Sequence, residues 1–499
     1  MRALFSATFL CAVLGLRPAA ADAPPPRFQP ATCPFTLGSG LVDGVDVRCG
    51  YLLVPENRQQ PATAMIRLAV ADFKSGTADP DPLIYLQGGP GGGSVATIGP
   101  AVTKATIARI AGGHDLILVD QRGAGLSQPS LSCPEVVTAQ RGLLRRPLLQ
   151  AAQVDTIARA AGQCHDRLAR AGVNLAAYTT EAAAADIAAL GPALGYQQVD
   201  LYGVSYGTRL ALTTMRLFPT GIRGVILDGV LPPQVDLFMQ YPVSMAHAFS
   251  VLVAGCDASL ACNHAYPHLD REFVSRVGHL NARPATVSLD DGSGAVVLTG
   301  DLLARLVFNA LYTTSSIPAI PYLINSVFHG RYGVIAAIYA GLDTATDDAL
   351  HLGAYYSVEC GEDSPFTTPA GIATAARALP TQLRAGVLDD PQSGLIGAAA
   401  CRRWTVPTVD AAQKMAVSSA IPTLILTGEY DPITPSSLGA LAARTLSRSF
   451  VFTYPGLGHG SFLLNPCATT MAEEFLANPT HSPDATCMTS MREPRFITP

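Results

Sequence analysis

A serine flanked by glycines is the residue of this sequence best suited to nucleophilic chemistry. Residues 203–207 read GVSYG, a G-x-S-x-G motif centred on Ser205, with a strand-like run at 199–204 before it and a helix-like run at 208–218 after it. A sharp strand-to-helix turn needs small residues around a strained serine and points the hydroxyl outward. The pattern predicts that Ser205 attacks acyl groups and that the backbone N–H of Tyr206 stabilises the oxyanion. An ordinary glycine-rich turn is the alternative.

A second glycine-rich segment, QGGPGGG at residues 87–93, follows the apolar run PLIYLQ at 82–87. Such a loop could cradle phosphate, but this one lacks the G-K-[ST] ending of a P-loop and the spacing of a dinucleotide-binding fingerprint. We interpret it as the other half of an oxyanion hole, with the backbone N–H of Gly89 as the donor. A flexible turn without a catalytic role is the alternative.

A serine nucleophile of this kind needs a base and an acid, which follow it along the chain. His459 lies in the loop GLGHG after a strand-like segment, and Asp431 closes the segment TLILTGEYD after a late strand. The histidine would take the serine proton, while the aspartate would hold the correct tautomer and stabilise the imidazolium. Asp228, also at a strand end, and Glu429 are the rival acids, and we favour Asp431 because its strand leads toward His459.

The segments around these residues indicate an α/β fold. Strand candidates that end in glycine-rich or polar turns alternate with helix-like stretches, which is typical of a mostly parallel sheet with helices on both faces. An alternating pair of runs after Val45 predicts an antiparallel hairpin at the start of this sheet. The strand candidates are residues 82–87, 115–120, 199–204, 224–228, 423–427 and 449–454.

A long interval separates the strand that ends at Asp228 from the one that begins near Ile421. It is rich in helix-like patterns, with a short hairpin-like run at 286–298, and we expect a mainly helical cap inserted over the active edge of the sheet. The predicted division is a signal peptide at 1–21, core segments at 22–235 and 404–499, and the cap at 236–403. Residues 22–32 are proline-rich and predict an arm rather than a domain.

The composition favours a large buried core and disfavours polyanion partners. The chain has 499 residues, 48% of them hydrophobic and 14% charged, with a net charge of −5. This balance gives no basic footprint for nucleic acid. The first residues combine Arg2, an apolar stretch and a run of alanines, which predicts a secretory signal cleaved after Ala21 rather than a membrane anchor.

The cysteine count agrees with export. Eleven cysteines are present, and removing Cys11 with the signal leaves an even ten. They fall into five sequential couples, for which neighbour pairing is the simplest disulfide scheme, although sequence cannot fix the connectivity. Close Cys-x-x-Cys pairs with further ligands are lacking, so we expect no metal and no cofactor. The mature cysteines are Cys33, Cys49, Cys133, Cys164, Cys256, Cys262, Cys360, Cys401, Cys467 and Cys487.

Five motifs in order, GGPGGGS, DQRGAGLS, LYGVSYGTRLAL, GEYDPITP and GLGHGS, resemble the prolyl iminopeptidase and tripeptidyl aminopeptidase branch of the α/β-hydrolases. The resemblance runs from about Val45 to about Cys487, and from about Trp404 it is similar to the tripeptidyl-aminopeptidase-like C-terminal domain. It implies an α/β-hydrolase fold and a secreted serine exopeptidase that acts on free peptide N-termini through an acyl-enzyme. Gln87 departs from the histidine that iminopeptidases commonly carry before the two glycines.

An aminopeptidase must bind a positive α-amino group, and carboxylates projecting from a cap would do so. The segment 357–366 places Glu359 and Glu362 around a cysteine, and our hypothesis is that one of them binds the substrate amine. A solvated acidic loop is the alternative. In the DQRGAGLS loop, we interpret Asp120 and Arg122 as structural support rather than substrate ligands.

The expected partner is therefore a peptide with a free N-terminus, without nucleic acid or a membrane anchor. Two other functions stay open. An esterase or amidase could use the same residues on small substrates, and a hydrolase scaffold without activity could serve as a binding protein.

Overall fold

A nine-stranded sheet forms the centre of the computed structural model, which describes residues 25–60, 64–77, 81–146, 150–289, 294–336, 338, 350–388, 394–460, 462 and 465–499. The strands lie in the order β1-β2-β3-β5-β4-β6-β7-β10-β11. They are β1 (Arg27–Pro30), β2 (Val47–Pro55), β3 (Met65–Phe73), β4 (Leu83–Leu86), β5 (Leu116–Val119), β6 (Val199–Val204), β7 (Ile222–Asp228), β10 (Thr423–Gly428) and β11 (Ser449–Tyr454).

The predicted hairpin is β2 paired antiparallel with β3. The parallel part of the sheet consists of β5, β4, β6, β7, β10 and β11. The mostly parallel sheet expected from the sequence is therefore confirmed. The proline-rich segment 22–32, expected to be an arm, contributes edge strand β1, which pairs antiparallel with β2.

Helices cover both faces of the sheet because successive strand side chains point to opposite sides. Leu201 packs in the cluster beneath helices α5 (Thr180–Leu194) and α6 (Tyr206–Leu217). Its neighbour Tyr202 packs on the other face, under α2 (Lys104–Ala111) and α18 (Pro466–Ala477). Each face thus buries its own apolar layer.

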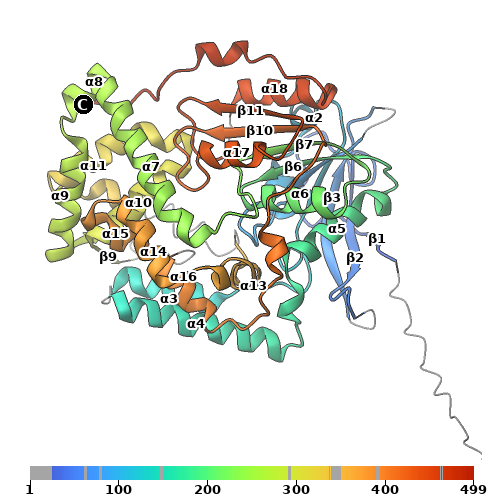
Figure 1. Cartoon of the computed structure of the whole chain (residues 1–499), viewed down its shortest axis with the longest axis horizontal. Helices are drawn as coiled ribbons and strands as arrows, with labels where there is room; N and C mark the ends of the chain where they lie inside the picture. The colour runs from blue at the N-terminus through green and yellow to red at the C-terminus, as the bar shows by residue number, and fades with distance from the viewer. Residues whose placement is uncertain are drawn as a thin grey trace, which may run out of the picture.

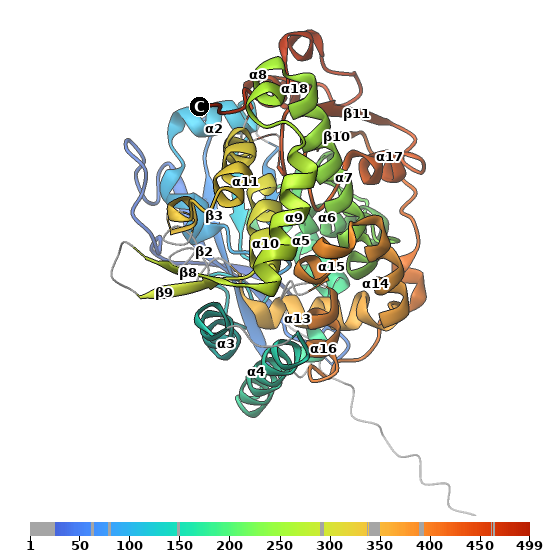
Figure 2. The ribbon, with the colours of Figure 1, turned by 90° about the vertical axis from the view of Figure 1, so that its left-hand side faces the viewer.

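A third apolar cluster lies outside the sheet layers, in the predicted cap. Helices α7 to α11 lie beside the sheet in Figure 1, and Figure 2 shows α7, α9, α10 and α15 in front of it. These elements are α7 (Leu237–Ala258), α8 (Leu260–Ala265), α9 (Leu269–Ala282), β8 (Ala285–Ser288), β9 (Ala295–Leu298), α10 (Gly300–Tyr312), α11 (Ile320–Phe328), α13 (Leu352–Glu362), α14 (Pro369–Ala375), α15 (Thr381–Leu388) and α16 (Gly394–Cys401).

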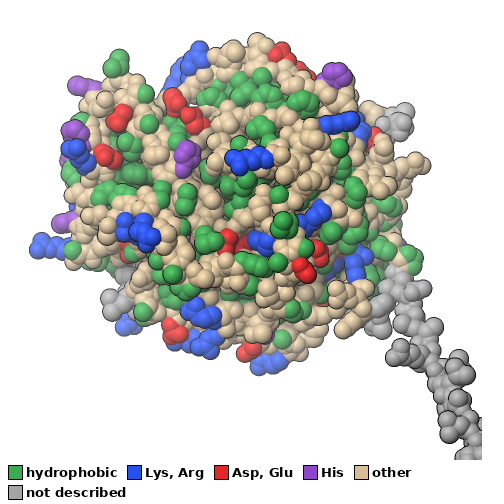
Figure 3. Space-filling view, in the orientation of Figure 1, with side chains coloured by type: hydrophobic (Ala, Val, Ile, Leu, Met, Phe, Trp, Pro, Cys, Tyr) green, Lys and Arg blue, Asp and Glu red, His purple; other side chains and the backbone are tan. Residues whose placement is uncertain are grey.

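Helix α7 is the one described helix long and apolar enough to cross a membrane by length and composition. Half of its most apolar stretch is buried inside the protein, where Met245, Phe249 and Leu252 belong to the cap cluster. On the face shown in Figure 3, Lys and Arg side chains are scattered rather than gathered into one patch.

Two helices that we did not anticipate extend the cap. Helices α3 (Pro134–Arg145) and α4 (Gln150–Arg170) come from the segment expected to belong to the core. They pack on each other, and α4 packs on α16 and α13, so they lie below the sheet beside the cap (Figure 1). Trp404 is buried in the apolar cluster that these helices share.

The five disulfides join the cysteines as five sequential neighbours, so the simplest pairing is the observed one. The pairs are Cys33–Cys49, Cys133–Cys164, Cys256–Cys262, Cys360–Cys401 and Cys467–Cys487. Such cross-links persist in oxidising compartments. The predicted signal peptide, residues 1–21, lies outside the described residues.

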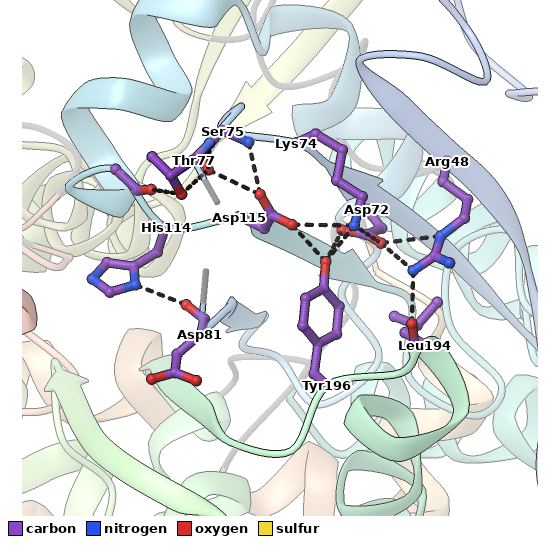
Figure 4. A network of polar contacts seen from close by, with 11 residues as sticks. Arg48, Asp72, Lys74, Ser75, Thr77, Asp81, His114, Asp115, Leu194 and Tyr196 are labelled. Atoms are coloured by element: carbon purple, nitrogen blue, oxygen red, sulfur yellow. Dashed lines mark hydrogen bonds and ion pairs between the residues drawn. The ribbon is translucent and has the colours of Figure 1, made fainter. Parts of the chain in front are cut away.

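A polar network ties the hairpin to the parallel strands at the end of the sheet where β5 begins (Figure 4). The Tyr196 hydroxyl lies 3.0 Å from Asp72 Oδ1 and 2.6 Å from Asp115 Oδ2, and it also contacts Lys74. Lys74 in turn forms ion pairs of 2.8 Å with Asp72 and 3.1 Å with Asp115. Burial and the two carboxylates raise the pKa of the Tyr196 phenol, so it stays a neutral hydrogen-bond donor.

Replacing Tyr196 with phenylalanine should lower the free energy of unfolding by about 1–3 kcal/mol, because two buried carboxylates lose a polar partner. Urea denaturation of the purified protein measures this. Tyr322→Phe is the matched control, since Tyr322 is 39% exposed and its hydroxyl should matter by less than about 0.5 kcal/mol. Equal stability of both variants would contradict a stabilising role for the network.

Candidate active site

Ser205 occupies the turn between β6 and α6. Its backbone has φ 58° and ψ −125°, a strained conformation for a residue with a side chain. A Cβ at Gly207 would lie 1.9 Å from the Leu86 carbonyl oxygen, and one at Gly203 would lie 2.4 Å from the Gly207 oxygen. Only glycine fits at either position, and the turn therefore fixes where the Ser205 hydroxyl lies.

His459 lies in the loop after β11 and is joined to Asp431, which follows β10. The distance from His459 Nδ1 to Asp431 Oδ2 is 2.7 Å. The other Asp431 oxygen accepts the amides of Ile433 at 2.9 Å and Thr434 at 2.8 Å. The carboxylate is thus held in place by its own turn. The Thr434 hydroxyl donates to Asp431 Oδ2 at 2.8 Å and lies 3.1 Å from His459 Nδ1.

The histidine and the serine lie against the same strand end. The Ser205 amide donates to the Asp228 carbonyl at 2.9 Å, and a Cβ at the next residue, Gly229, would lie 2.9 Å from His459 Cε1. The Nε2 atom of His459 is buried and has no hydrogen-bond partner among the described residues. The Ser205 hydroxyl is therefore not hydrogen-bonded to Nε2 in this structure. Because Nδ1 donates its proton to Asp431, Nε2 of the neutral ring is the nitrogen that can accept one.

The charges of Asp431 and His459 shift each other's pKa in opposite directions. Burial would raise the pKa of the Asp431 carboxyl, but His459 and the hydrogen bonds lower it below its usual value. Burial would lower the pKa of His459, but the Asp431 carboxylate raises it above its usual range. The aspartate thus stays ionised, and the histidine can hold a proton without leaving its site.

The two rival acids, Asp228 and Glu429, accept hydrogen bonds from groups other than His459. Asp228 Oδ2 accepts the Phe462 amide at 2.8 Å and the Tyr202 hydroxyl at 3.2 Å, and Glu429 accepts the Gly456 amide at 3.0 Å. Thr434 was not anticipated as a partner of the histidine. The only local signal was its position three residues after the aspartate, in a turn in which the Thr434 hydroxyl can reach back to the Asp431 side chain.

The glycine loop lies directly against the serine. A Cβ at Gly88 would lie 2.8 Å from Ser205 Cβ and 3.3 Å from its hydroxyl oxygen. The Gly88 amide donates to the Gln87 side chain at 3.0 Å, and the Gly92 amide donates to the Gly88 carbonyl at 3.1 Å. Neither bond uses the Gly89 amide. Tyr206 opens α6, where the first backbone amides have no acceptor within the helix.

The DQRGAGLS loop is anchored by buried contacts. Asp120 accepts the amides of Val95 at 2.9 Å and Leu126 at 2.8 Å. Arg122 donates two hydrogen bonds to Asp186 on α5, at 2.8 and 2.9 Å. Both side chains thus hold the loop in shape.

The acidic segment is not a solvated loop, so that alternative is wrong. Glu359, 0% exposed, and Glu362, 4% exposed, lie at the end of the buried helix α13, and Asp363, 0% exposed, follows it. Glu362 accepts the amide and the hydroxyl of Thr180, both at 2.6 Å, and so secures the start of α5. Asp363 forms ion pairs with Arg209, at 3.1 Å, and with Lys414.

Glu359 differs from its two acidic neighbours. Neither of its carboxylate oxygens has a hydrogen-bond partner among the described residues. Burial raises its pKa well above the ordinary value, and the charge of Asp363 adds to this effect. Burial, Glu362 and Glu359 also raise the pKa of the Tyr206 phenol, which places both acids near the residue after Ser205. The positive charges of Arg209 and Lys414 lower the pKa of Glu359 but do not cancel the effect of burial, and neither side chain forms a hydrogen bond with it.

The same helix begins at the glycine loop, since the His351 amide just before α13 donates to the Gly91 carbonyl at 2.9 Å. Helix α13 therefore runs past both the glycine loop and helix α6. Within the described part of the chain, no group of three or more His, Cys, Asp or Glu side chains could hold a metal ion.

Comparison with known proteins agrees with this geometry. Residues 81–258 match the family model described as alpha/beta hydrolase fold, and residues 392–487 match the model described as TAP-like protein. The chain is a serine hydrolase of the α/β-hydrolase fold. The first match contains the serine turn and the glycine loop of this hydrolase, and the second contains its aspartate and histidine.

Several curated relatives span most of the hydrolase. A tripeptidyl aminopeptidase of Streptomyces coelicolor is 27% identical over 88% of this chain and 83% of its own length. The serine protease Hip1 of Mycobacterium tuberculosis is 24% identical over 82% of this chain and 81% of its own. Carboxylesterase B of the same organism is 27% identical over 87% and 85%, respectively. The named relatives thus include both peptidases and an esterase.

Proposed function

We propose that the chain is a secreted serine aminopeptidase that hydrolyses amide bonds at free peptide N-termini. Ser205 would be the nucleophile, His459 the base and Asp431 its orienting acid, with the amides of Gly89 and Tyr206 as the oxyanion hole. The observation that carries the peptidase assignment is the buried, unpartnered carboxylate of Glu359 near this site. The peptidase names among the relatives support it.

The proposed reaction proceeds in two halves. Ser205 Oγ attacks the substrate carbonyl while His459 Nε2 takes the hydroxyl proton, and the two amides stabilise the resulting oxyanion. The imidazolium then donates that proton to the leaving amine as the C–N bond breaks, which leaves an ester on Ser205. Water attacks this ester while His459 Nε2 takes its proton. The imidazolium then returns this proton to Ser205 Oγ as the bond between Oγ and the acyl carbon breaks, and the acid product departs. Asp431 stays ionised throughout and stabilises each imidazolium.

Glu359 is the better candidate for the amine site because the other acids already have strong partners. Glu362 accepts two hydrogen bonds from Thr180, and Asp363 is shared by Arg209 and Lys414. An α-ammonium group would give Glu359 a hydrogen-bonded counter-ion, whereas Arg209 and Lys414 act on it without a hydrogen bond. Such a site would favour substrates whose N-terminus is unblocked.

Glu359→Gln should lower kcat/KM for free aminoacyl and tripeptidyl amides by about 10- to 100-fold, because a hydrogen bond between charged groups contributes about 1.5–3 kcal/mol. Turnover of N-acetylated analogues should change little. The measurement is a panel of free and acetylated prolyl, alanyl and tripeptidyl chromogenic amides, which also determines how many residues leave per cycle.

Glu362→Gln is the matched control on the same helix. It should keep the preference for free N-termini and instead reduce stability, because it weakens the contacts that start α5. An unchanged preference in Glu359→Gln would rule out Glu359 as the amine ligand.

Hydrolysis of small esters is the second candidate function, favoured by the likeness to a carboxylesterase. The same substrate panel should include short acyl esters. Rapid turnover of esters together with negligible turnover of every free amide would replace the aminopeptidase assignment.

We propose that the protein is secreted or periplasmic, which the five disulfides support. We retain residues 236–403 as the proposed cap, with the proposed core segments at 22–235 and 404–499. N-terminal sequencing of the exported protein would test the proposed cleavage after Ala21.

A further inference from the structure

The loop that carries the histidine touches the end of cap helix α10. The His459 amide donates to the Tyr312 carbonyl at 3.0 Å, and the Gly458 amide donates to the Thr314 hydroxyl at 3.0 Å. A Cβ at Gly458 would lie 2.6 Å from the Leu311 carbonyl oxygen. The cap and the histidine loop thus meet backbone to backbone.

The Tyr312 side chain also covers the imidazole. The two ring centroids are 4.4 Å apart with an angle of 50° between the planes. The imidazole also lies close to the backbone of Gly229, where a Cβ would be 2.9 Å from Cε1. The His459 ring is therefore confined by a residue of the cap as well as by residues of the core.

We infer that Tyr312, supplied by the cap, is a positioning residue that fixes the His459 ring and stabilises its protonated form. The inference rests on the proposed role of His459 as the base. An aromatic ring within about 6 Å of a cation attracts it through the negative charge of its face. In acyl transfer, positive charge develops on the imidazole as the serine proton moves to it, so this attraction increases toward the transition state.

The acid loop has a similar contact with the cap. Tyr430, the residue before Asp431, is buried in the apolar cluster of the cap, and a Cβ at Gly255 on α7 would lie 2.2 Å from its hydroxyl oxygen. The aspartate and the histidine are therefore both supported by cap helices. The nucleophile turn, by contrast, is built by strand and helix of the core.

The charged groups that act on His459 come from two elements besides α10. Asp431 after β10 and Asp228 at the end of β7 both favour the protonated ring, while burial opposes it. Tyr312 adds an uncharged contribution in the same direction. Its removal should therefore shift the titration of His459 to lower pH, whereas the two carboxylates remain in place.

The test is the rate at which a fluorophosphonate labels Ser205, measured from pH 5 to pH 9. This reaction needs the nucleophile and the base but no peptide recognition. In Tyr312→Leu, the plateau rate should fall about 3- to 30-fold, and the midpoint of the acidic limb should move down by about half to one pH unit. Tyr312→Phe keeps the ring face and should stay within about threefold of the parent.

Tyr322→Leu is the matched control. Tyr322 lies on α11 and, like Tyr312, is 39% exposed. It should leave both rate and midpoint unchanged. A Tyr312→Leu profile identical to the parent, or a Tyr312→Phe profile as impaired as that of Tyr312→Leu, would overturn the inference. Failure of the proposed base is distinguishable, because the parent itself would then label without a pH-dependent limb and His459→Ala would label normally.

Discussion

Ser205→Ala is expected to lower the rate of amide hydrolysis by about 10⁶-fold, because it removes the proposed nucleophile, whose hydroxyl lies against the glycine loop. The residual rate should still exceed that in water by about 10³–10⁴-fold, since the oxyanion donors and the binding groups remain. Steady-state hydrolysis of a chromogenic peptide amide measures the loss, and mass spectrometry after fluorophosphonate treatment should show no adduct.

The fold should survive this change. Alanine has the same Cβ as serine, so it adds no strain at the φ of 58° that the turn imposes. Circular dichroism and the melting temperature serve as the control for an intact fold. An alanine variant that keeps more than about a hundredth of the parent rate would show that another group is the nucleophile.

Asp431→Asn is expected to lower kcat by about 10⁴-fold. The turn amides of Ile433 and Thr434 would still hold the side chain, but a neutral amide stabilises neither the required tautomer nor the imidazolium. Because the carboxylate raises the pKa of His459, its removal should also move the acidic limb of the kcat/KM profile to lower pH. In the parent, activity falls as pH drops through a midpoint above the ordinary histidine value.

Asp228→Asn is the comparison that separates the two acids. Asp228 accepts hydrogen bonds from Tyr202 and Phe462 rather than from His459 Nδ1, so its variant should lose far less activity than Asp431→Asn. A larger loss in Asp228→Asn would reverse the assignment of the acid. The pH–rate profile of both variants on one substrate decides between these outcomes.

Local sequence signals predicted the sheet well because each signal has a local physical cause. The runs at 199–204 and 423–427 are apolar and bounded by glycine or polar turns, and they form β6 and most of β10. The glycines at 203 and 207 were predictable for the same reason, since the contacts that exclude a side chain there arise within one turn and its neighbouring strand.

The sequence did not predict which elements pack on each other when they lie far apart along the chain. Helix α4 packs on α13 and α16, about two hundred residues later in the chain, and no local pattern predicts such a partner. The same applies to Glu359 and Glu362, which are three residues apart on one helix. Only the three-dimensional contacts show that Thr180 donates hydrogen bonds to Glu362 and that Glu359 has no hydrogen-bond partner among the described residues.

Tyr312 is the clearest example of a contact that could not be predicted from the sequence. It ends the run DLLARLVFNALY, whose pattern is helix-like and carries no sign of a contact with the histidine. Its contact with His459 depends on how the cap docks on the core, and that depends on surfaces contributed by many segments.

The order of the five disulfides has a consequence for how the chain matures. Each bridge joins consecutive cysteines of the described chain, separated by 6 to 41 residues. A polypeptide that enters an oxidising compartment N-terminus first presents its thiols in this same order. The first described cysteine is then followed by its native partner, and the same holds for the third, fifth, seventh and ninth. Oxidation in pairs during translocation therefore reaches the correct connectivity without reshuffling by an isomerase.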